Sequence, residues 1–416
     1  MVEIRLTGGQ HAALRDLLLT RRDVESKAFV LCGVAEGHKR TVLLGREVVP
    51  VPDGAYAERS LTRVVTRGEF VAETLDRCPA EGLALLEAHS HPWGDGAAFS
   101  PVDDASDERK FRATAGLPAP FRHATSVFGA DMGFAARLFD PARRRSCPVE
   151  RLTIVSDPIR RYQADGTEAG LPSSAGAAFD RQVGAFGAEG QQALSALTVA
   201  VVGAGGLGGQ VALALSLLGV GHLVLIDPDR LEASNANRAV AVTGRQVRLG
   251  KAKVVALRET LGKLFAPPAI TAVRQSVTDP VAWPHLLDAD LVVGAVDSAA
   301  ARSFLNAFCA CCLLPYLDGG VGVKAEGGQI AAAGGQVRTV LPGETPCLAC
   351  YDAEAGRRAV EAHTPGQRAL ARAAGYVQGE HIPAPQVVFL NGIVGNALVW
   401  EAVKLTTGCL PAAPYV

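Results

Sequence analysis

Net charge is nearly absent from this sequence of 416 residues. Lys and Arg together number 41, Asp and Glu number 42, and the formal charge at pH 7 is −1. Nucleic acids and anionic membranes attract proteins with a strong positive charge, so we predict neither as a partner. A long apolar run is also missing. The most apolar stretch, residues 197–226, is interrupted by glycines, and we predict no membrane span.

We also predict no secretory leader, because the first residues do not show a charged segment followed by an apolar one. The nine cysteines are an odd number, which suits reduced thiols better than a set of disulfides. We therefore expect a cytoplasmic protein. Only two methionines accompany many Ala, Gly and Arg residues, which indicates a bacterial origin, and the length allows two or three domains.

A cluster of potential metal ligands is present near residue 90. His89-Ser90-His91-Pro92 is followed by a Gly-rich stretch, then by Ser100 and Asp103. The His-x-His spacing places both rings on one side of an extended strand, because side chains alternate along it. Three nitrogen and oxygen ligands leave one position for water, as in a catalytic zinc site. The spacing therefore predicts Zn²⁺ bound by His89, His91 and Asp103.

The same stretch resembles the metal-binding motif of the JAMM (JAB) metalloproteases, which cut peptide or isopeptide bonds after ubiquitin-like proteins. The resemblance covers about residues 1–160 and implies a JAB/MPN-like α/β domain over residues 1–164. It also implies that Ser100 stabilises the oxyanion and that an upstream Glu is the general base. Glu25 precedes an apolar strand as the family requires, and Glu36, beyond that strand, is the weaker candidate. The loop before Ser100 is slightly longer than in the family.

A second motif predicts a nucleotide-binding fold. Residues 198–202 read as a buried strand, and they lead through a glycine-rich turn into residues 211–218, which have helical composition. Glycines in such a turn let the backbone approach phosphates at the N-terminus of a helix. A second strand, residues 222–226, ends at Asp227, where a ribose-binding carboxylate belongs. On these residues alone, an NAD- or FAD-dependent dehydrogenase remains open. The glycines concerned are Gly203, Gly205, Gly206 and Gly208.

The residues after Asp227 resemble the adenylation domains of ubiquitin-activating enzymes and of their bacterial relatives ThiF and MoeB. The match runs from about Phe179 to the end, which implies a linker at residues 165–178 and a Rossmann-like domain at residues 179–416. It implies that Asp227 holds the ATP ribose and that Asp297 binds Mg²⁺. Arg181 matches an arginine that relatives insert into a partner's ATP site, which implies a homodimer. The residues matched to triphosphate contacts are Asn235, Arg238 and Lys253.

Cysteines near the end of the sequence leave two alternatives open. Relatives often close a structural zinc with two Cys-x-x-Cys pairs, and Cys347 and Cys350 match the first pair. The second pair is missing, although His363, His381 or Cys409 could complete a mixed site. Alternatively, Cys350 or Cys347 forms a thioester, or the reaction stops at the acyl-adenylate.

Both predicted activities concern the C-terminal glycine of a ubiquitin-like protein. We therefore expect a bifunctional bacterial enzyme that uses Zn²⁺, ATP and Mg²⁺, with a ubiquitin-like protein and a separate conjugating enzyme as partners. A link to antiviral defence is an analogy only. The alternative is activation and processing of a sulfur carrier for thiamine, molybdopterin or cysteine synthesis. A scaffold with one degenerate domain is the third alternative, disfavoured by the complete residue sets.

Several elements can also be predicted from apolar patterns. We expect a strand leading into the zinc site, a last strand of the first domain, a helical or mobile crossover segment and a long closing helix. The strands are predicted at residues 27–34, 41–51, 83–89 and 149–162, the crossover segment at 353–374 and the helix at 387–406.

Overall fold

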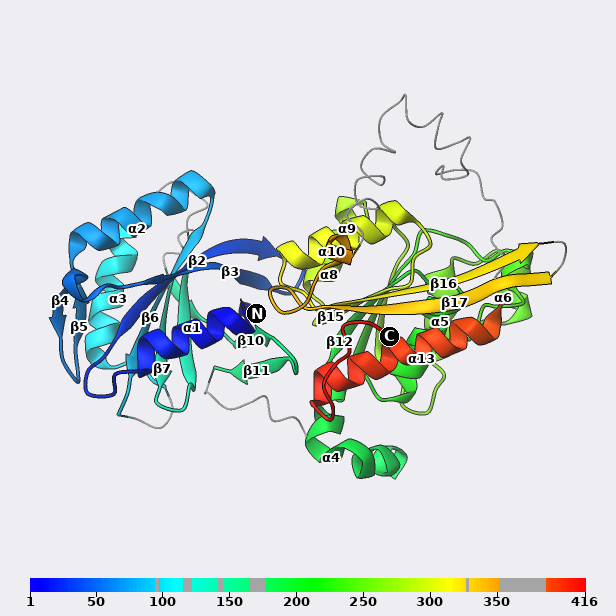
Figure 1. The fold of residues 1–416 in the computed structure, drawn as a ribbon, viewed down its shortest axis with the longest axis horizontal. Coiled ribbons are helices and arrows are strands. Elements are labelled where there is room, and N and C mark those ends of the chain that lie inside the picture. Colours follow the sequence, from blue (N-terminus) through cyan, green and yellow to red (C-terminus); the bar gives the residue numbers. More distant parts are fainter. Residues whose placement is uncertain (94–96, 115–121, 141–144, 165–176, 327–328, 352–386) are drawn as a thin grey trace. The chain divides into compact units, whose positions relative to one another are not determined.

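The computed structural model describes residues 1–93, 97–114, 122–140, 145–164, 177–326, 329–351 and 387–416. The chain divides into two units, Met1–Gly170 and Leu171–Val416, each of which is described by itself (Figure 1). The crossover segment predicted at 353–374, with His363 and also His381, lies outside the described residues, as does most of the linker predicted at 165–178.

The first unit is built on one mixed sheet of nine strands, in the order β11-β10-β1-β3-β2-β6-β7-β8-β9. Strand β1 runs parallel to β3 and β10, and β6 runs parallel to β7, while the other neighbours are antiparallel. The strands are β1 (Val2–Thr7), β2 (Lys27–Glu36), β3 (Thr41–Pro50), β6 (Ala84–His91), β7 (His123–Gly129), β8 (Phe134–Asp140), β9 (Arg145–Pro148), β10 (Arg151–Val155) and β11 (Arg160–Gln163); a separate ribbon pairs β4 (Tyr56–Arg59) with β5 (Val64–Thr66).

Helices cover both faces of this sheet because its central strands are apolar on both sides. Val30 and Leu86 share a core cluster with Leu14 of α1 (Gly8–Leu19). Their neighbours Phe29 and Leu85 point the other way and share a cluster with Cys78 of α2 (Gly68–Glu81). This alternation is the two-residue period of a strand, and burial on both faces explains the continuous apolar runs. A third helix, α3 (Pro101–Thr114), follows the loop after β6, and a short 3₁₀ turn, η1 (Asp53–Ala55), precedes β4.

Three of the strands predicted in this unit are confirmed, since β2, β3 and β6 contain most of the ranges 27–34, 41–51 and 83–89. The strand Arg-Leu-Thr-Ile-Val predicted within residues 149–162 is present as β10, but it is not the last strand of this unit. Two antiparallel strands, β10 and β11, occupy this range and are joined by a turn that contains Pro158. Proline has no backbone N–H to donate to a strand ladder, so a continuous strand is interrupted there.

The second unit contains a six-stranded sheet in the order β14-β13-β12-β15-β16-β17. The first five strands are mutually parallel and β17 is antiparallel to β16. Numbered along this unit, the order is that of a doubly wound Rossmann-like sheet, whose ligands bind at the carboxyl ends of the strands. The predicted α/β class is therefore confirmed. The strands are β12 (Thr198–Val202), β13 (His222–Ile226), β14 (Ala269–Val273), β15 (Leu291–Gly294), β16 (Tyr316–Glu326) and β17 (Gln329–Val340).

Two groups of helices enclose this sheet on opposite faces (Figure 1). Val202 and Ile226 share a core cluster with Leu286 of α8 (Trp283–Leu287) and Leu305 of α9 (Ala299–Cys311), whereas α13 (Val388–Thr407) packs on α5 (Gly206–Leu217) and β16. The helical elements are η2 (Ala177–Phe179), α4 (Asp180–Ser195), α5 (Gly206–Leu217), η3 (Ala233–Asn235), α6 (Gly244–Arg248), α7 (Lys253–Leu261), η4 (Pro280–Ala282), α8 (Trp283–Leu287), α9 (Ala299–Cys311), α10 (Leu348–Tyr351) and α13 (Val388–Thr407).

Helix α13 confirms the closing helix predicted at 387–406. By length and composition it could cross a membrane, the one such helix within the part of the chain that the structure describes. Most of its apolar window is buried against other elements of the second unit, including α4, α5 and β17. A core helix of a folded domain has this same composition, because it is apolar on nearly every side.

Candidate functional site

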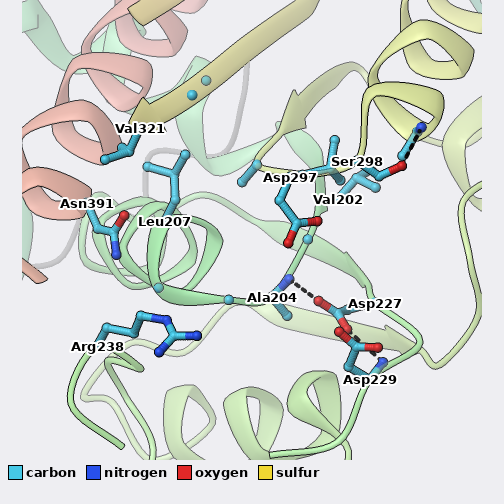
Figure 2. Close-up of a pocket in the computed structure, with 18 of the residues that line it drawn as sticks. Val202, Ala204, Leu207, Asp227, Asp229, Arg238, Asp297, Ser298, Val321 and Asn391 are labelled. Carbon is cyan, nitrogen blue, oxygen red and sulfur yellow. Dashed lines mark hydrogen bonds between the residues drawn. The ribbon is translucent and has the colours of Figure 1, made fainter. Parts of the chain in front are cut away.

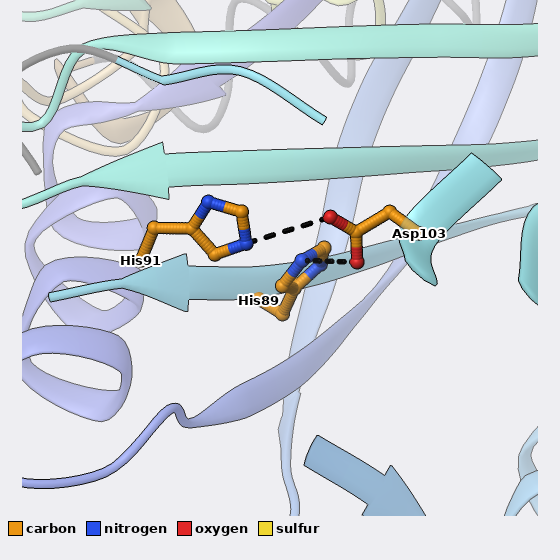
Figure 3. Close-up of side chains that lie close together, drawn as sticks. All are labelled: His89, His91 and Asp103. Atoms are coloured by element: carbon orange, nitrogen blue, oxygen red, sulfur yellow. Dashed lines mark ion pairs between the residues drawn. The ribbon is translucent and has the colours of Figure 1, made fainter. Parts of the chain in front are cut away.

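His89, His91 and Asp103 meet in the first unit (Figure 3). Nε2 of His89 lies 3.1 Å from Asp103 Oδ1, and Nε2 of His91 lies 3.5 Å from Asp103 Oδ2. One donor atom from each residue lies within 4.8 Å of the other two, the only such group in the described part of the chain. Both histidines belong to β6 and are separated by one residue, so their rings project from the same face of the strand.

The start of helix α3 positions Asp103. Its Oδ2 accepts hydrogen bonds from the backbone N–H and the hydroxyl of Ser100, both at 2.7 Å. The Asp103 N–H donates in return to Ser100 Oγ at 3.2 Å. Pro101 occupies the first helical position, where its missing N–H costs nothing. Ser100-x-x-Asp103 is therefore a reciprocal helix cap, and the cap directs the carboxylate toward the histidines.

The two carboxyl groups at this site, those of Asp103 and Glu25, have pKa values that are shifted in opposite directions. Burial opposes ionisation of Asp103, but its close contacts with the rings of His89 and His91 outweigh burial and hold the pKa of Asp103 well below its ordinary value. Burial raises the pKa of Glu25 to about 7, and the charge of Asp103 adds to this effect while His91 opposes it. The two carboxyl groups thus differ in proton affinity, which is the arrangement expected of a ligand beside a proton acceptor.

The position of Glu25 distinguishes it from Glu36. Glu25 Oε1 lies 3.7 Å from His91 Nε2 and its side chain is buried. Glu36 lies at the other end of β2, where it forms an ion pair with Arg122 at 2.7 Å. Since β2 and β6 are antiparallel and Lys27 pairs with His89, only the Glu25 end of β2 meets the histidines.

Trp93 was missed by the sequence reasoning, although it directly follows His-x-His-Pro. Its indole stacks on the His91 ring with centroids 5.0 Å apart and an interplanar angle of 16°. Its Nε1 donates a hydrogen bond to the carbonyl of Leu61 at 2.6 Å, while 54 % of the residue stays exposed. The ring therefore forms an exposed apolar wall beside the histidine pair. An aromatic residue in a glycine-rich loop was the available signal.

A buried charge cluster also escaped sequence reasoning. Glu87 lies two residues before His89 on β6, and its carboxylate contacts Lys110 of α3 at 2.8 Å and His123 of β7 at 2.9 Å. On α3, Asp107 contacts Arg137 of β8 at 2.7 Å. These contacts hold α3, which carries Asp103, against the sheet. The sheet includes β6, which carries the two histidines.

The second unit holds a cavity of about 1680 Å³ at the carboxyl ends of its parallel strands (Figure 2). This is the position at which doubly wound sheets bind ligands. Residues from the turns after β12, β13 and β15 line it together with residues of β16 and β17. Every nucleotide residue predicted from the sequence except Gly208 lines this cavity, namely Gly203, Gly205, Gly206, Asp227, Asn235, Arg238, Lys253 and Asp297.

Two glycines, one in the turn after β12 and one in the first turn of α5, lie so close to other backbone atoms that a side chain would not fit. Gly203 has a φ of +92°, and a Cβ there would lie 2.4 Å from the carbonyl oxygen of Ala295. A Cβ on Gly208 would lie 1.7 Å from the carbonyl oxygen of Gly203, so Gly208 lets α5 pack directly on the turn. At Gly205 a Cβ would meet no atom within 4 Å, because this residue faces open space. Gly205 thus leaves room for a ligand over the turn.

Asp227 is fixed at the end of β13 by the glycine turn itself. Its Oδ2 accepts a hydrogen bond from the Ala204 N–H at 2.7 Å, and its Oδ1 accepts one from the Asp229 N–H at 2.8 Å. Burial raises the pKa of Asp227, with the charge of Lys253 acting in the opposite direction. Lys253, the first residue of α7, is itself paired with Asp229 at 2.7 Å.

Three further residues predicted to bind the nucleotide differ in the contacts that they make with the rest of the protein. Asn235 Oδ1 accepts the Glu232 N–H at 3.0 Å and so closes its own turn. Arg238 contacts the carbonyl of Ser234, and Figure 2 shows its guanidinium at the glycine turn. Asp297 is exposed to the cavity, and among the described residues it has no ion-pair partner. A free carboxylate facing a cavity is suited to a hard cation such as Mg²⁺.

Arg302 holds the loop that carries Asp297. Its guanidinium donates to Asp318 Oδ1 at 2.9 Å and to the carbonyl of Val296 at 3.1 Å. Asp318 is buried at the start of β16, and burial raises its pKa. Arg302 therefore fixes the backbone next to Asp297 to a strand inside the sheet.

Neither Arg181 nor the candidate cysteines line this cavity. Arg181 is exposed on α4 and is not among the residues that line the cavity of its own chain.

Cys347 and Cys350 lie with their sulfur atoms 3.7 Å apart at α10. Burial raises the pKa of Cys347, but hydrogen bonds with Asn306 and Cys350 outweigh it and lower that pKa overall. Cys409 is exposed beyond α13.

Residues 179–415 match the model of the ThiF family. The chain is 31 % identical over 232 residues to the molybdopterin-synthase adenylyltransferase of Escherichia coli, a match that covers 55 % of this chain and 82 % of that relative. It is also 31 % identical over 165 residues to the vegetative HesA protein of Trichormus variabilis, covering 40 % of this chain and 58 % of HesA. Ubiquitin-like modifier-activating enzyme 5 of Xenopus laevis is 29 % identical, with 39 % of this chain and 41 % of that enzyme covered. Among solved structures, E. coli MccB with ATP is 18 % identical with a TM-score of 0.46, over 59 % of this chain and 68 % of MccB.

Proposed function

The chain belongs to the ThiF family, and we propose that its second unit uses ATP to adenylate the C-terminal carboxylate of a ubiquitin-like or sulfur-carrier protein. In this reaction a carboxylate oxygen attacks the α-phosphorus of ATP, the bond to the bridging oxygen of the β-phosphate breaks, and pyrophosphate leaves. The observation that carries the proposal is one cavity that gathers the glycine turn, Asp227, Arg238, Lys253 and Asp297.

Each of these residues has a role in the proposed reaction. Asp227, held by two backbone N–H groups, accepts hydrogen bonds from the hydroxyls of the ATP ribose. Arg238 and Lys253, with Asn235 beside them, stabilise the negative charge that develops on the phosphates. Asp297, an exposed carboxylate that lines the cavity, would hold Mg²⁺, which neutralises phosphate charge when bound. Lys253 exchanges its contact with Asp229 for one with phosphate.

For the first unit we propose a zinc-dependent peptidase or isopeptidase of the JAMM type. The donor set fits zinc, because His89, His91 and Asp103 offer two imidazoles and a carboxylate within 4.8 Å of one another. In the described part of the chain, the buried Nε2 of His89 also has no hydrogen bond of good geometry. Zinc, when bound, supplies a Lewis acid that lowers the pKa of water and polarises a carbonyl.

The residues around this donor set then complete the hydrolysis. Glu25 takes the proton of the attacking water and returns it to the leaving amine. Ser100 donates its hydroxyl hydrogen bond to the oxyanion, which requires it to leave Asp103 Oδ2 in that step. Trp93 forms the wall of the site and favours a narrow, glycine-containing substrate tail. The buried charged cluster around Glu87 holds α3 against β6.

Together the two activities describe a bifunctional bacterial enzyme acting on one protein partner. The adenylation half activates its C-terminal glycine, and the peptidase half trims a precursor or removes conjugates. A separate conjugating enzyme is a further proposed partner. The active form is a homodimer in which Arg181 reaches the partner's ATP site, since its exposure on α4 leaves it available. Cys347 or Cys350 serves as the nucleophile if a thioester forms.

A metabolic role is the second candidate, supported by the likeness to the E. coli molybdopterin-synthase adenylyltransferase. In that case the partner is a sulfur carrier, and the acyl-adenylate passes to a sulfur donor. The two candidates share the adenylation step and differ in what accepts the activated glycine.

ATP–pyrophosphate exchange with ubiquitin-like proteins of the same genome tests the proposal, followed by a gel with and without thiol. Exchange with a reducible adduct supports a thioester-forming enzyme of conjugation. Exchange without an adduct, together with a requirement for sulfide or thiosulfate, supports the metabolic role. No exchange with any candidate protein contradicts the adenylation proposal and leaves the peptidase proposal to be tested separately.

A further inference from the structure

Asn391 is a buried polar residue at the wall of the nucleotide cavity that no motif in the sequence singles out. It lies near the start of α13 and lines the cavity, with 3 % of its surface exposed. Within the described residues, its Nδ2 has no hydrogen-bond partner. Buried amides in folded proteins are normally hydrogen-bonded, and an unsatisfied one beside a cavity indicates a ligand that supplies the missing acceptor.

The unpaired amide points at the start of helix α5. A Cβ placed on Gly206 would lie 2.4 Å from Asn391 Nδ2 and 3.1 Å from the carbonyl oxygen of Arg238. Gly206 is the first residue of this twelve-residue helix, and Gly205 before it offers no side-chain cap. The N–H groups of the first turn and the amide of Asn391 are therefore donors gathered at one place. Donors at the positive end of a helix dipole bind an anion.

The direction of the glycine turn identifies which part of a nucleotide reaches this place. Asp227 is bonded to Ala204 at one end of the turn, and Asn391 lies beside Gly206 at the other. Figure 2 shows Asn391 and Arg238 together at the end of the turn away from Asp227. A nucleotide whose ribose is held by Asp227 extends its phosphates along the turn toward Asn391.

We infer that Asn391 binds ATP by donating a hydrogen bond from Nδ2 to a phosphate oxygen. The inference rests on the proposed adenylation function of this cavity, and it assigns a phosphate-binding role to α13, an element that the nucleotide motifs do not include. Recognition of the triphosphate then depends on the packing of α13 against α5, which brings the amide to the glycine turn.

Calorimetric titration of the full chain with ATP and with adenosine, in the presence of Mg²⁺, tests this inference. Asn391→Ala should weaken ATP binding about tenfold, the size expected for a hydrogen bond to a charged group. It should leave adenosine binding unchanged, because adenosine lacks the phosphates. Asn391→Asp has the same shape and should weaken ATP binding further, since it adds negative charge beside the phosphates. Thermal unfolding of both variants shows whether they fold.

Asn396→Ala is the matched control. Asn396 lies on the same helix, is exposed, and its amide is already bonded to the carbonyl of Gly392 at 2.8 Å, so its loss should not change ATP binding. Equal weakening of ATP and adenosine binding by Asn391→Ala would overturn the inference, because it would indicate a packing role. Unchanged ATP binding with a raised KM for the carrier protein would also overturn it and would assign the amide to the substrate carboxylate. If the unaltered chain bound neither ATP nor adenosine, the proposed function would fail first, and the inference with it.

Discussion

Asp103 Oδ2 lies 2.7 Å from the hydroxyl of Ser100 and 3.5 Å from Nε2 of His91. The same carboxylate oxygen therefore closes the cap of α3 and faces a histidine of β6. Because helix capping fixes the direction of the side chain, the local stability of α3 and the geometry of the proposed metal site depend on one residue pair.

Removal of the Ser100 hydroxyl tests this coupling. Ser100→Ala should destabilise the first unit by about 1 kcal/mol through loss of the cap, and it should also weaken zinc binding. Ser100→Thr keeps a capping oxygen and should retain both properties. Thermal unfolding and competition for zinc with a chromogenic chelator measure the two effects. Zinc affinity unchanged in Ser100→Ala would show that the cap does not position Asp103 for the metal.

Zinc content tests the ligands directly. The purified chain should bind one zinc ion per molecule, and Asp103→Ala or His89→Ala should lose it, as measured by plasma mass spectrometry. Glu25→Gln should keep the zinc and lose cleavage of a ubiquitin-like fusion by about 100-fold or more, as expected for a general base. Glu36→Gln is the control, because Glu36 is paired with Arg122 at the opposite end of β2. Full cleavage by Glu25→Gln would remove Glu25 as the base.

Asp297→Asn preserves the shape of the side chain and removes its charge. We expect ATP–pyrophosphate exchange to fall by about 100-fold or more, because a magnesium ligand acts on the charge of the transferring phosphate. Cleavage by the first unit should be unaffected, which serves as the internal control for folding. Persistent exchange would show that Asp297 is not the magnesium ligand.

A buried carboxylate in β1 predicts acid sensitivity of the first unit. Glu3 is fully buried and contacts Arg5 at 3.0 Å and Arg151 at 2.8 Å. Burial opposes its ionisation, but Arg151, Arg5 and Arg40 outweigh burial and hold the pKa of Glu3 far below its ordinary value of 4.5. Its contribution to stability is therefore complete above that value and is lost as the pH falls below it.

Glu3→Gln should accordingly lower the free energy of unfolding by about 3–5 kcal/mol near neutral pH, because it leaves buried arginines uncompensated. The difference from the unaltered chain should shrink as the pH falls below 4.5, and urea denaturation across this range measures it. Asp16→Ala breaks an exposed pair with Arg15 and should change stability by less than about 0.5 kcal/mol. A pH-independent effect of Glu3→Gln would contradict this account.

The lowered pKa of Cys347 predicts a reactive thiol. More of it is thiolate at a given pH than for an ordinary cysteine, so iodoacetamide should label it at lower pH than a cysteine in a model peptide. Asn306→Ala removes one hydrogen bond that favours the thiolate and should shift labelling to higher pH. Peptide mapping by mass spectrometry follows both. Labelling at the same pH as the model peptide would exclude Cys347 as an activated nucleophile.

Local pattern was enough to predict many elements of this chain. The strands β12 and β13 are short apolar runs next to glycine or aspartate, and α13 is a long segment in which apolar residues predominate between isolated polar ones, so neighbouring residues alone indicate them. The break between β10 and β11 was missed because residues 151–155 and 160–163 both carry strand-like residues. Their antiparallel pairing depends on how the chain folds back between them.

Neighbouring residues in the sequence establish the chemical groups and their local spacing: the His-x-His pair, the Ser100–Asp103 cap and the glycine turn before α5. Each of these lies within a few residues, where strand and helix periods decide which side chains meet. Which distant groups join them follows from how the chain folds. Glu25 reaches His91 because β2 and β6 pair antiparallel, and Asn391 reaches Gly206 because α13 packs on α5. Contacts between residues so far apart depend on the packing of whole elements, and no local period records that packing.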